Sequence, residues 1–225
     1  MGSHKTSEST DDPKFGVGSF VIVPYGVLGT RMMANGAVVN KAPPPSVETC
    51  AFVDPAGLPY IQQFGPSGAG GAAGAIYRFL GISNDPAFPA DVVEAVKATG
   101  QAKAHRYASG TCIHVVGPNF NLEPCGYDDA RARLSLAYEN VLREYAACDA
   151  PALRLLPISG GIFAGPFMRD VPQLTHDALQ DACAHFAGTE PALVERLTKR
   201  RLELCIFAEG EWQGFITAGF AHVES

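Results

Sequence analysis

The sequence lacks a hydrophobic run long enough to cross a membrane, because no stretch approaches the roughly 18 apolar residues that such a helix needs. It also lacks a secretory signal, since the first fourteen residues are polar and contain no apolar core. We therefore expect a soluble intracellular protein, cytoplasmic or nuclear, in which residues 1–14 form a disordered leader. Residues 15–225 are expected to form one domain.

Positive charge is scarce as well. The chain has 17 Lys and Arg against 23 Asp and Glu, so its formal net charge is −6. A protein that holds nucleic acid through the phosphates needs a basic stripe that displaces counterions. The one basic cluster, residues 199–201, fits the end of a short helix, where positive charge complements the helix dipole. We therefore expect a small-molecule partner and no nucleic acid.

Several chemical motifs are absent. The six cysteines form no C-x-x-C pair and do not cluster with histidine, which argues against a zinc site. We expect neither a metal nor a cofactor. Cys50, Cys112 and Cys205 lie in or beside apolar runs, where reduced cysteine behaves as a small hydrophobe. No glycine loop is followed by the Lys-Ser/Thr of a P-loop, and no Gly-x-Ser-x-Gly elbow is present.

Short apolar runs typical of strands alternate with amphipathic segments typical of helices. The predicted strands cover residues 20–25, 37–41, 51–54, 102–106, 111–116, 153–158 and 202–207. The predicted helices cover 74–80, 92–98, 127–147, a segment around 174–186 and a shorter one from residue 189. Such alternation predicts an α/β fold with helices on both faces of a mostly parallel sheet, and ligands at the carboxyl ends of its strands.

The first candidate loop, residues 68–74, contains no side chain larger than a methyl group and leads into a helix. Small residues let backbone amides approach a ligand, and a helix start adds unpaired N–H donors, so this segment could hold a diphosphate. A flexible linker is the alternative interpretation. The predicted ligand-binding residues are Gly70, Gly71, Ala72, Ala73 and Gly74.

The second candidate loop, residues 159–166, follows a predicted strand. Its glycines would expose amides to phosphate, and Phe163 could lie against a ribose or a base. A structural turn with Phe163 as a core residue is the alternative. The predicted ligand-binding residues are Ser159, Gly160, Gly161, Ile162 and Phe163.

Three segments together resemble one family, the macrodomains. They are GAGGAAGAIYRFLG at residues 68–81, TCIHVVGP at 111–118 and SGGIFAGP at 159–166, in the family's order. The resemblance covers about residues 36–220. It implies a three-layer α/β/α fold with a central mixed, mostly parallel sheet. It also implies a cleft between the two loops for the diphosphate and distal ribose of ADP-ribose.

The sequence departs from the family where catalysis would be expected. Asp54 and Gly57 stand where family members have asparagines, and Ala73 replaces an acidic residue, which leaves no side chain there to move a proton. An alternative alignment uses residues 38–42 for the Asn turn, at the cost of a longer insertion. The family's adenine-binding aspartate is not evident. Asp54 is the one carboxylate expected beside the cleft, as a catalytic group, a ribose ligand or a turn cap.

These features support three hypotheses. The first is a module that binds ADP-ribose or a related nucleotide diphosphate, free or attached to protein. The second is a hydrolase acting on mono-ADP-ribosylated protein or O-acyl-ADP-ribose, with Asp54 as its catalytic group. The third is a degenerate macrodomain scaffold whose cleft is closed by residues 60–64. His114 lies in an apolar strand and is interpreted as a core histidine.

Overall fold

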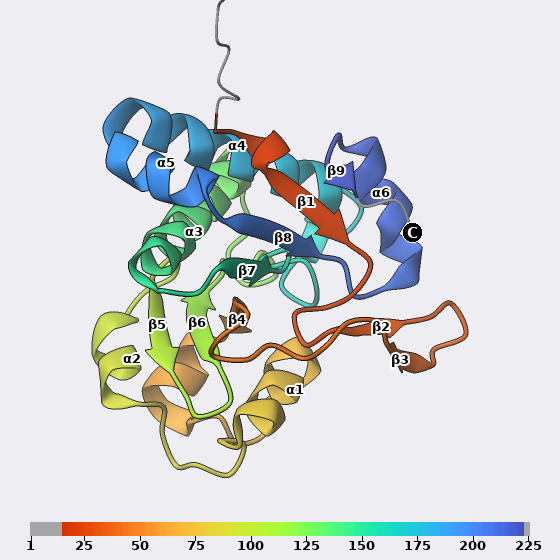
Figure 1. The fold of residues 1–225 in the computed structure, drawn as a ribbon. Helices are drawn as coiled ribbons and strands as arrows, with labels where there is room; N and C mark the ends of the chain where they lie inside the picture. The colour runs from red at the N-terminus through yellow and green to blue at the C-terminus, as the bar shows by residue number, and fades with distance from the viewer. Residues whose placement is uncertain (1–14, 223–225) are drawn as a thin grey trace, which may run out of the picture.

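The computed structural model describes residues 15–222, and the predicted leader lies outside them. A seven-stranded sheet in the order β5-β6-β4-β7-β8-β1-β9 runs through the molecule (Figure 1). All of its pairings are parallel except that of β5 with β6. The strands are β1 (Phe20–Val23), β4 (Ala51–Ala56), β5 (Ala102–Arg106), β6 (Thr111–Val116), β7 (Ala152–Leu155), β8 (Arg201–Cys205) and β9 (Ala221–His222).

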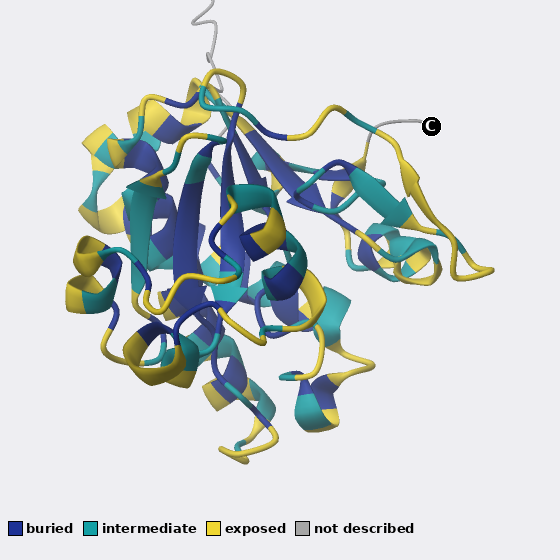
Figure 2. Cartoon of the chain, turned by 90° about the horizontal axis from the view of Figure 1, so that it is seen from below, coloured by how far each residue is buried: buried dark blue, intermediate teal, exposed yellow. Residues whose placement is uncertain are grey.

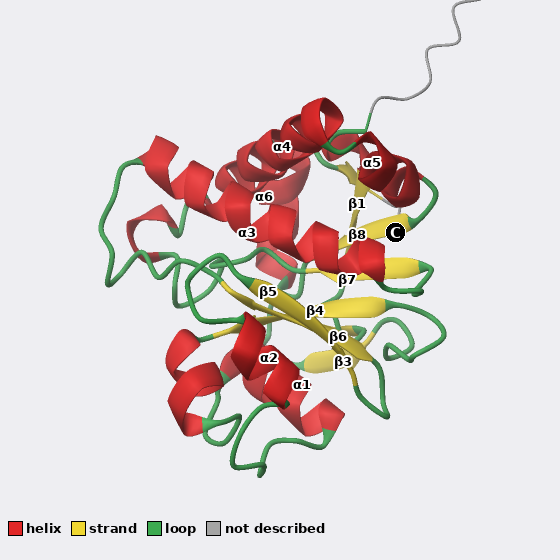
Figure 3. Cartoon of the chain, turned by 90° about the vertical axis from the view of Figure 1, so that its left-hand side faces the viewer, coloured by secondary structure: helices red, strands yellow, loops and turns green. Residues whose placement is uncertain are grey.

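Helices cover both faces of this sheet, as Figure 3 shows. On one face lie α3 (Tyr127–Ala147), α4 (Val171–Thr189), α5 (Pro191–Thr198) and α6 (Trp212–Thr217). On the other lie α1 (Gly71–Leu80) and α2 (Ala90–Ala95). Each face has its own apolar cluster, so the predicted three-layer α/β/α architecture with a mostly parallel sheet is confirmed. Within the described residues, no helix is long and apolar enough to cross a membrane.

The helix α3 follows directly from its sequence. Leu134, Tyr138, Leu142 and Tyr145 recur at helical spacing and are all buried against the sheet or α4. Acidic residues in the first turn interact favourably with the positive end of the helix dipole and stabilise the helix. The predicted range, 127–147, is the range observed.

The central strands β4 and β6 are almost completely buried, as the dark strands of Figure 2 show. Successive side chains alternate between the two helical layers. Ala51 and Val53 pack on the α3 face, whereas Phe52 and Ala56 pack on the α1 face. Pro55 of β4 is half-buried and reaches the carboxyl-terminal edge of the sheet.

The predicted strand at 37–41 is real but does not join the main sheet. It forms β3 (Val38–Asn40), which pairs antiparallel with β2 (Thr30–Met32) in a hairpin that projects from the body (Figure 1). All three residues of β3 are exposed, as expected for a hairpin that pairs outside the main sheet. The predicted strand at 153–158 ends at Leu155. Residues 60–64, for which no helix was predicted, form a π-helical turn.

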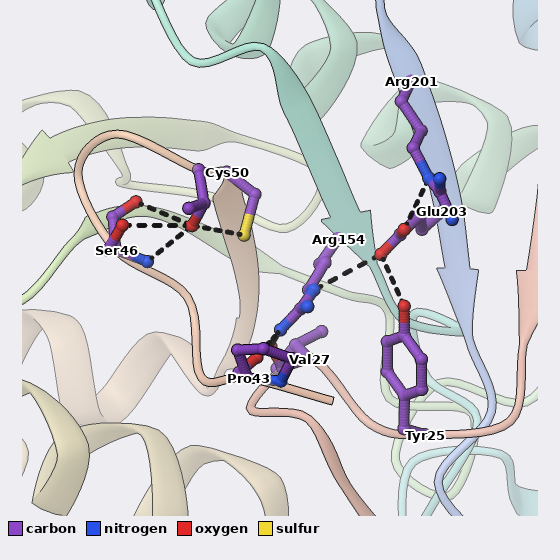
Figure 4. Close-up of polar contacts among 9 residues, drawn as sticks. Tyr25, Val27, Pro43, Ser46, Cys50, Arg154, Arg201 and Glu203 are labelled. Carbon is purple, nitrogen blue, oxygen red and sulfur yellow. Dashed lines mark hydrogen bonds and ion pairs between the residues drawn. The ribbon is translucent and has the colours of Figure 1, made fainter. Parts of the chain in front are cut away.

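A buried charged cluster holds the long connection between β1 and β4 against the sheet (Figure 4). Nε of Arg154 lies 3.3 Å from Oε2 of Glu203 on the neighbouring strand. Nη1 of Arg154 donates to the carbonyl oxygens of Val27 (3.3 Å) and Pro43 (2.9 Å). Burial and the nearby Glu203 carboxylate raise the pKa of Tyr25 to about 12. The connection is thus fixed by hydrogen bonds to β7, the strand that leads into the second candidate loop.

The six cysteines are free. Cys50, Cys112 and Cys205 are buried, which confirms the interpretation of these three as reduced core residues. Burial raises the pKa of all three thiols, so they remain protonated at neutral pH.

Candidate ligand pocket

The two small-residue loops meet at the carboxyl ends of β4 and β7 and enclose a cavity of about 410 Å³. Parallel sheets place ligands at this edge, and the volume is in the range of sites for small molecules. The structure brings nine of the ten predicted ligand-binding residues into the lining: Gly70, Gly71, Ala72, Ala73, Ser159, Gly160, Gly161, Ile162 and Phe163. That these residues bind a ligand stays a prediction.

The tenth residue, Gly74, lies beneath the loop instead. A Cβ atom at this position would come within 2.2 Å of the carbonyl oxygen of Ala69, so the helix can approach the loop closely only because residue 74 is glycine. Its amide donates to the carbonyl oxygen of Gly70 at 3.0 Å and opens α1. Gly74 therefore shapes the loop and has no free amide for a ligand.

The first loop presents the N-terminal amides of α1 to the cavity. Gly71, Ala72 and Ala73 are the first three residues of this ten-residue helix, and their N–H groups precede its first hydrogen bond. Gly71 has φ +56°, a conformation that favours glycine, and this turns the chain into the helix. The arrangement is a donor cluster at the positive end of a helix dipole.

The second loop presents a further row of amides. Within the described part of the chain, the N–H groups of Gly161, Ile162 and Phe163 have no protein acceptor. The amide of Gly160, by contrast, donates to the carbonyl oxygen of Pro157 at 3.0 Å and shapes the turn. Of the predicted residues 160–163, only 161–163 therefore have backbone N–H groups that could bind a ligand.

A strained residue anchors the second loop. Ser159 has φ +58°, the one positive φ outside glycine among the described residues. Its Oγ donates to the carbonyl oxygen of Pro118 at 2.6 Å, which ties the loop to the segment after β6. A Cβ at Gly117 would come within 2.6 Å of both Ile158 and Ser159, so only glycine allows this approach. The loop is thus held in place before any ligand arrives.

The cavity has an unusual electrostatic character, because its lining contains no Asp, Glu, Lys, Arg or His side chain. Its polar side chains are those of Tyr60, Tyr77 and Ser159, and the Ser159 hydroxyl is already bonded. An anionic ligand would therefore be held by backbone amides and the dipole of α1. No lining side chain is of a type that ordinarily exchanges a proton near neutral pH.

Asp54 lies behind the pocket rather than in its lining. It is 0% exposed, and its Oδ2 accepts a hydrogen bond from Nδ1 of His114 at 2.7 Å. Nε2 of His114 lies 2.8 Å from the hydroxyl of Tyr107. His114 is thus the core histidine predicted from its apolar strand. Burial, and then the Asp54 carboxylate, raise the pKa of Tyr77 well above its ordinary value.

Eight lining residues were not among the predicted ligand-binding residues: Pro55, Gly57, Tyr60, Ala69, Tyr77, Gly117, Leu156 and Pro157. Pro55 and Gly117 directly follow predicted strands, and Leu156 and Pro157 lie near the end of the predicted strand 153–158, which was the available signal. Tyr60 belongs to the long segment between the strand 51–54 and the first loop. Tyr77 sits inside the apolar pattern of a helix, where nothing local distinguishes a pocket residue from a core residue.

The fold matches known structures although the sequence stands apart. No protein-family model and no curated protein sequence matches the chain significantly. A point mutant of the Oceanobacillus iheyensis macrodomain aligns with 77% of this chain and 85% of its own, at 19% identity and a TM-score of 0.51. The chain has the macrodomain fold.

Two further macrodomain structures match the chain with TM-scores below 0.5. The Trypanosoma brucei macrodomain in complex with ADP covers 86% of this chain and 78% of its own, at 12% identity and a TM-score of 0.49. Another Oceanobacillus iheyensis mutant, solved with ADPR, covers 77% and 86%, at 16% identity and a TM-score of 0.48. The macrodomain fold predicted from three segments is confirmed by the match at a TM-score of 0.51, and at 19% identity the fold is what that match shows.

Proposed function

We propose that this protein binds ADP-ribose or a closely related nucleotide diphosphate, free or attached to protein, in the cavity between its two loops. The observation that carries this proposal is the pair of facing amide rows, 71–73 and 161–163, on a cavity of about 410 Å³. Gly71, Ala72, Gly161 and Ile162 are exposed, so their N–H groups are open to the oxygens of a ligand.

A diphosphate suits this arrangement better than other anions of similar size. Two rows of donors from separate loops of the lining can each take one phosphate group, with the α1 dipole adding attraction at one of them. A single carboxylate would satisfy only one wall. The absence of Lys and Arg from the lining means that recognition depends on amide geometry, which positions phosphate oxygens more strictly than a flexible cation does.

Fold similarity supports this assignment. One mutant of the Oceanobacillus iheyensis macrodomain matches the fold of this chain at a TM-score of 0.51. A different mutant of the same protein has been solved with ADPR. We transfer this ligand to the present chain on the strength of the loops rather than the alignment alone.

The site favours binding over hydrolysis. Hydrolysis of an ADP-ribosyl ester needs a group that activates water, and the lining offers no carboxylate or imidazole. Asp54, the candidate for this role, is fully buried and already accepts the His114 hydrogen bond. A hydrolase therefore remains the second hypothesis, and it would require either movement of β4 or a water held by backbone alone.

The degenerate-scaffold hypothesis expected residues 60–64 to close the cleft. Tyr60 lines the cavity without filling it, and Phe64 is 61% exposed at the surface. The open cavity argues against a scaffold that has lost its ligand.

The first experiment is calorimetric titration of the purified protein with ADP-ribose, with AMP and ATP as comparison ligands. The proposal expects binding of ADP-ribose in the micromolar range and weaker binding of AMP, which lacks the second phosphate. Absence of heat with all three ligands would overturn it. Incubation with a mono-ADP-ribosylated protein, followed by a search for released ADP-ribose, tests the hydrolase hypothesis in the same preparation.

A further inference from the structure

The pocket opens to solvent where its lining residues are exposed. Five lining residues are exposed, and all belong to the two loops: Gly70, Gly71, Ala72, Gly161 and Ile162. Four of them carry no side chain larger than a methyl group. Ile162 is 85% exposed, so its side chain is the one sizeable group at the mouth. Whatever is attached to a ligand in this cavity therefore leaves between the two loops, beside Ile162.

A second exposed apolar side chain lies next to this mouth. Leu122 is 78% exposed and belongs to the segment between β6 and α3. This segment is bonded to the second loop, because the amide of Phe120 donates to the carbonyl oxygen of Phe163 at 3.0 Å. Nδ2 of Asn121 donates to the carbonyl oxygen of Ile162 as well. Leu122 and Ile162 thus lie on neighbouring segments, and we call this pair the apolar rim.

The apolar rim is set by its own backbone. The amide of Leu122 donates to the carbonyl oxygen of Asn119 at 3.0 Å, which closes a tight turn. A Cβ atom at Gly165 would come within 2.8 Å of the Phe120 backbone, so the second loop and the turn are closely packed. Because the two segments are already fixed, less entropy is lost when a partner covers the rim.

The charged groups beside the rim are already paired. Glu123 follows Leu122 in the chain, and its Oε2 lies 2.9 Å from Nη1 of Arg133. Nη2 of Arg133 lies 2.7 Å from Oδ2 of Asp129, and the pocket lining has no charged side chain. A partner at the rim therefore gains by burying apolar surface rather than by forming new ion pairs.

We propose that the apolar rim docks the polypeptide of an ADP-ribosylated protein and selects chains with apolar residues beside the modified side chain. The inference rests on the proposed function, since it assumes that the nucleotide lies in the cavity between the two loops. Continuity determines the choice of partner, because Ile162 belongs to both the pocket lining and the rim. A chain attached to a bound nucleotide meets the rim as it leaves the mouth, and both aliphatic side chains lose exposed surface against it.

The experiment compares three ligands by calorimetric titration. One is free ADP-ribose, and two are synthetic peptides that carry ADP-ribose on a central side chain through a linkage that resists hydrolysis. The first peptide has leucine and valine on either side of the modified residue, and the second has serine and glycine. Leu122→Ser removes one rim side chain and leaves the pocket lining intact. Leu136→Ser is the matched control, because Leu136 is 49% exposed on α3 and lies outside the lining.

The wild type is expected to bind the apolar peptide about fivefold more tightly than free ADP-ribose or the serine peptide, a fraction of the gain from full burial of a leucine side chain. Leu122→Ser should remove most of this preference and leave the affinity for free ADP-ribose unchanged. Leu136→Ser should keep the preference.

Equal wild-type affinities for the two peptides overturn the inference, as does a preference that survives in Leu122→Ser. A wild-type dimer in analytical ultracentrifugation that Leu122→Ser dissociates also overturns it, since a second copy of the chain then covers the rim. If the wild type binds none of the three ligands, the proposed function itself fails, which is a distinguishable result.

Discussion

The carboxylate of Asp54 and the imidazole of His114 form a hydrogen bond of 2.7 Å between neighbouring central strands, and both side chains are fully buried. The neutral tautomer of His114 that fits both contacts carries its proton on Nδ1, toward the carboxylate, and its Nε2 then accepts from the Tyr107 hydroxyl. The chain of three groups pairs Oδ2 of Asp54 and both ring nitrogens of His114 on the α1 face of the sheet. Among the described residues, Oδ1 of Asp54 and the Tyr77 hydroxyl are buried without a hydrogen-bond partner.

This pairing predicts that Asp54 acts on stability more than on ligand binding. Asp54→Ala leaves the Nδ1–H of His114 without an acceptor in the core, which should lower the free energy of unfolding by about 2–3 kcal/mol or more in urea titrations. ADP-ribose affinity should change less than threefold under conditions where the variant is folded. The exposed Asp149→Ala is the control and should leave stability unchanged. A stable Asp54→Ala protein that has lost ligand binding would contradict this prediction and revive a direct role for Asp54.

A negative charge in the second loop should abolish binding. Gly161 is exposed, and a Cβ atom there would have no neighbour within 4 Å, so Gly161→Glu should fold normally. Its carboxylate would lie against the proposed diphosphate and repel it, and we expect at least a tenfold loss of ADP-ribose affinity by calorimetry. Gly188→Glu carries the same charge change on an exposed, unobstructed glycine of α4 and should bind as the wild type does. Equal affinities in the two variants would mean that the loop does not face the phosphates.

The close approach at Gly74 predicts a combined defect. Gly74→Ala would place a methyl group 2.2 Å from the Ala69 carbonyl oxygen, so the loop must move away from the helix. We expect destabilisation of about 1–3 kcal/mol and weaker ADP-ribose binding, because the amides of 71–73 move with the loop. Gly126→Ala, at an N-cap with no atom within 4 Å, is the matched control and should affect neither property. Thermal unfolding and calorimetry on both variants measure the two effects.

The buried Arg154 predicts a stability effect that surface arginines do not share. Arg154→Met removes the donors to Val27 and Pro43. The free energy of unfolding should fall by about 3 kcal/mol, which is at the low end for a broken buried ion pair. The low end is expected because Glu203 keeps Arg201, whose Nε lies 2.6 Å from Oε1. Arg133→Met, which breaks only exposed ion pairs, should cost less than about 1 kcal/mol. Urea unfolding distinguishes these values, and equal costs would contradict the structural role of Arg154.

Buried thiols predict a loss of stability at alkaline pH. Burial raises the pKa of Cys183 from its ordinary value of 9.0 to about 12. The unfolded thiol therefore ionises first, and the stability that this thiol contributes is complete below about pH 9 and disappears as the pH rises toward 12. Cys183→Ala should make the slope of stability against pH shallower in this window, by at most about 1.4 kcal/mol per pH unit. Cys125→Ala, at a half-exposed position, should change the slope less, and identical slopes in wild type and Cys183→Ala would refute the prediction.

The local sequence pattern alone was enough to predict several parts of this protein's structure. The 3.6-residue spacing of Leu134, Tyr138, Leu142 and Tyr145 predicted α3, because a helix buries one stripe whatever it packs against. The two small-residue loops were also visible in the sequence, since only small side chains let amides face a ligand. Their order around a central apolar strand predicted the macrodomain fold, which the structure bears out.

Other features depend on pairings between residues far apart in the chain, and these only the tertiary structure decided. Asp54 ends a predicted strand and looked like a pocket residue, but the register that sets it beside His114, sixty residues later, turns its side chain into the core. Val38 and Val39 predicted a strand, but that this strand pairs only with β2 and stays exposed was not visible in its sequence. Tyr60 and Phe163 meet at Gly57 only because their two loops fold to the same edge of the sheet, and no spacing within either loop encodes that contact.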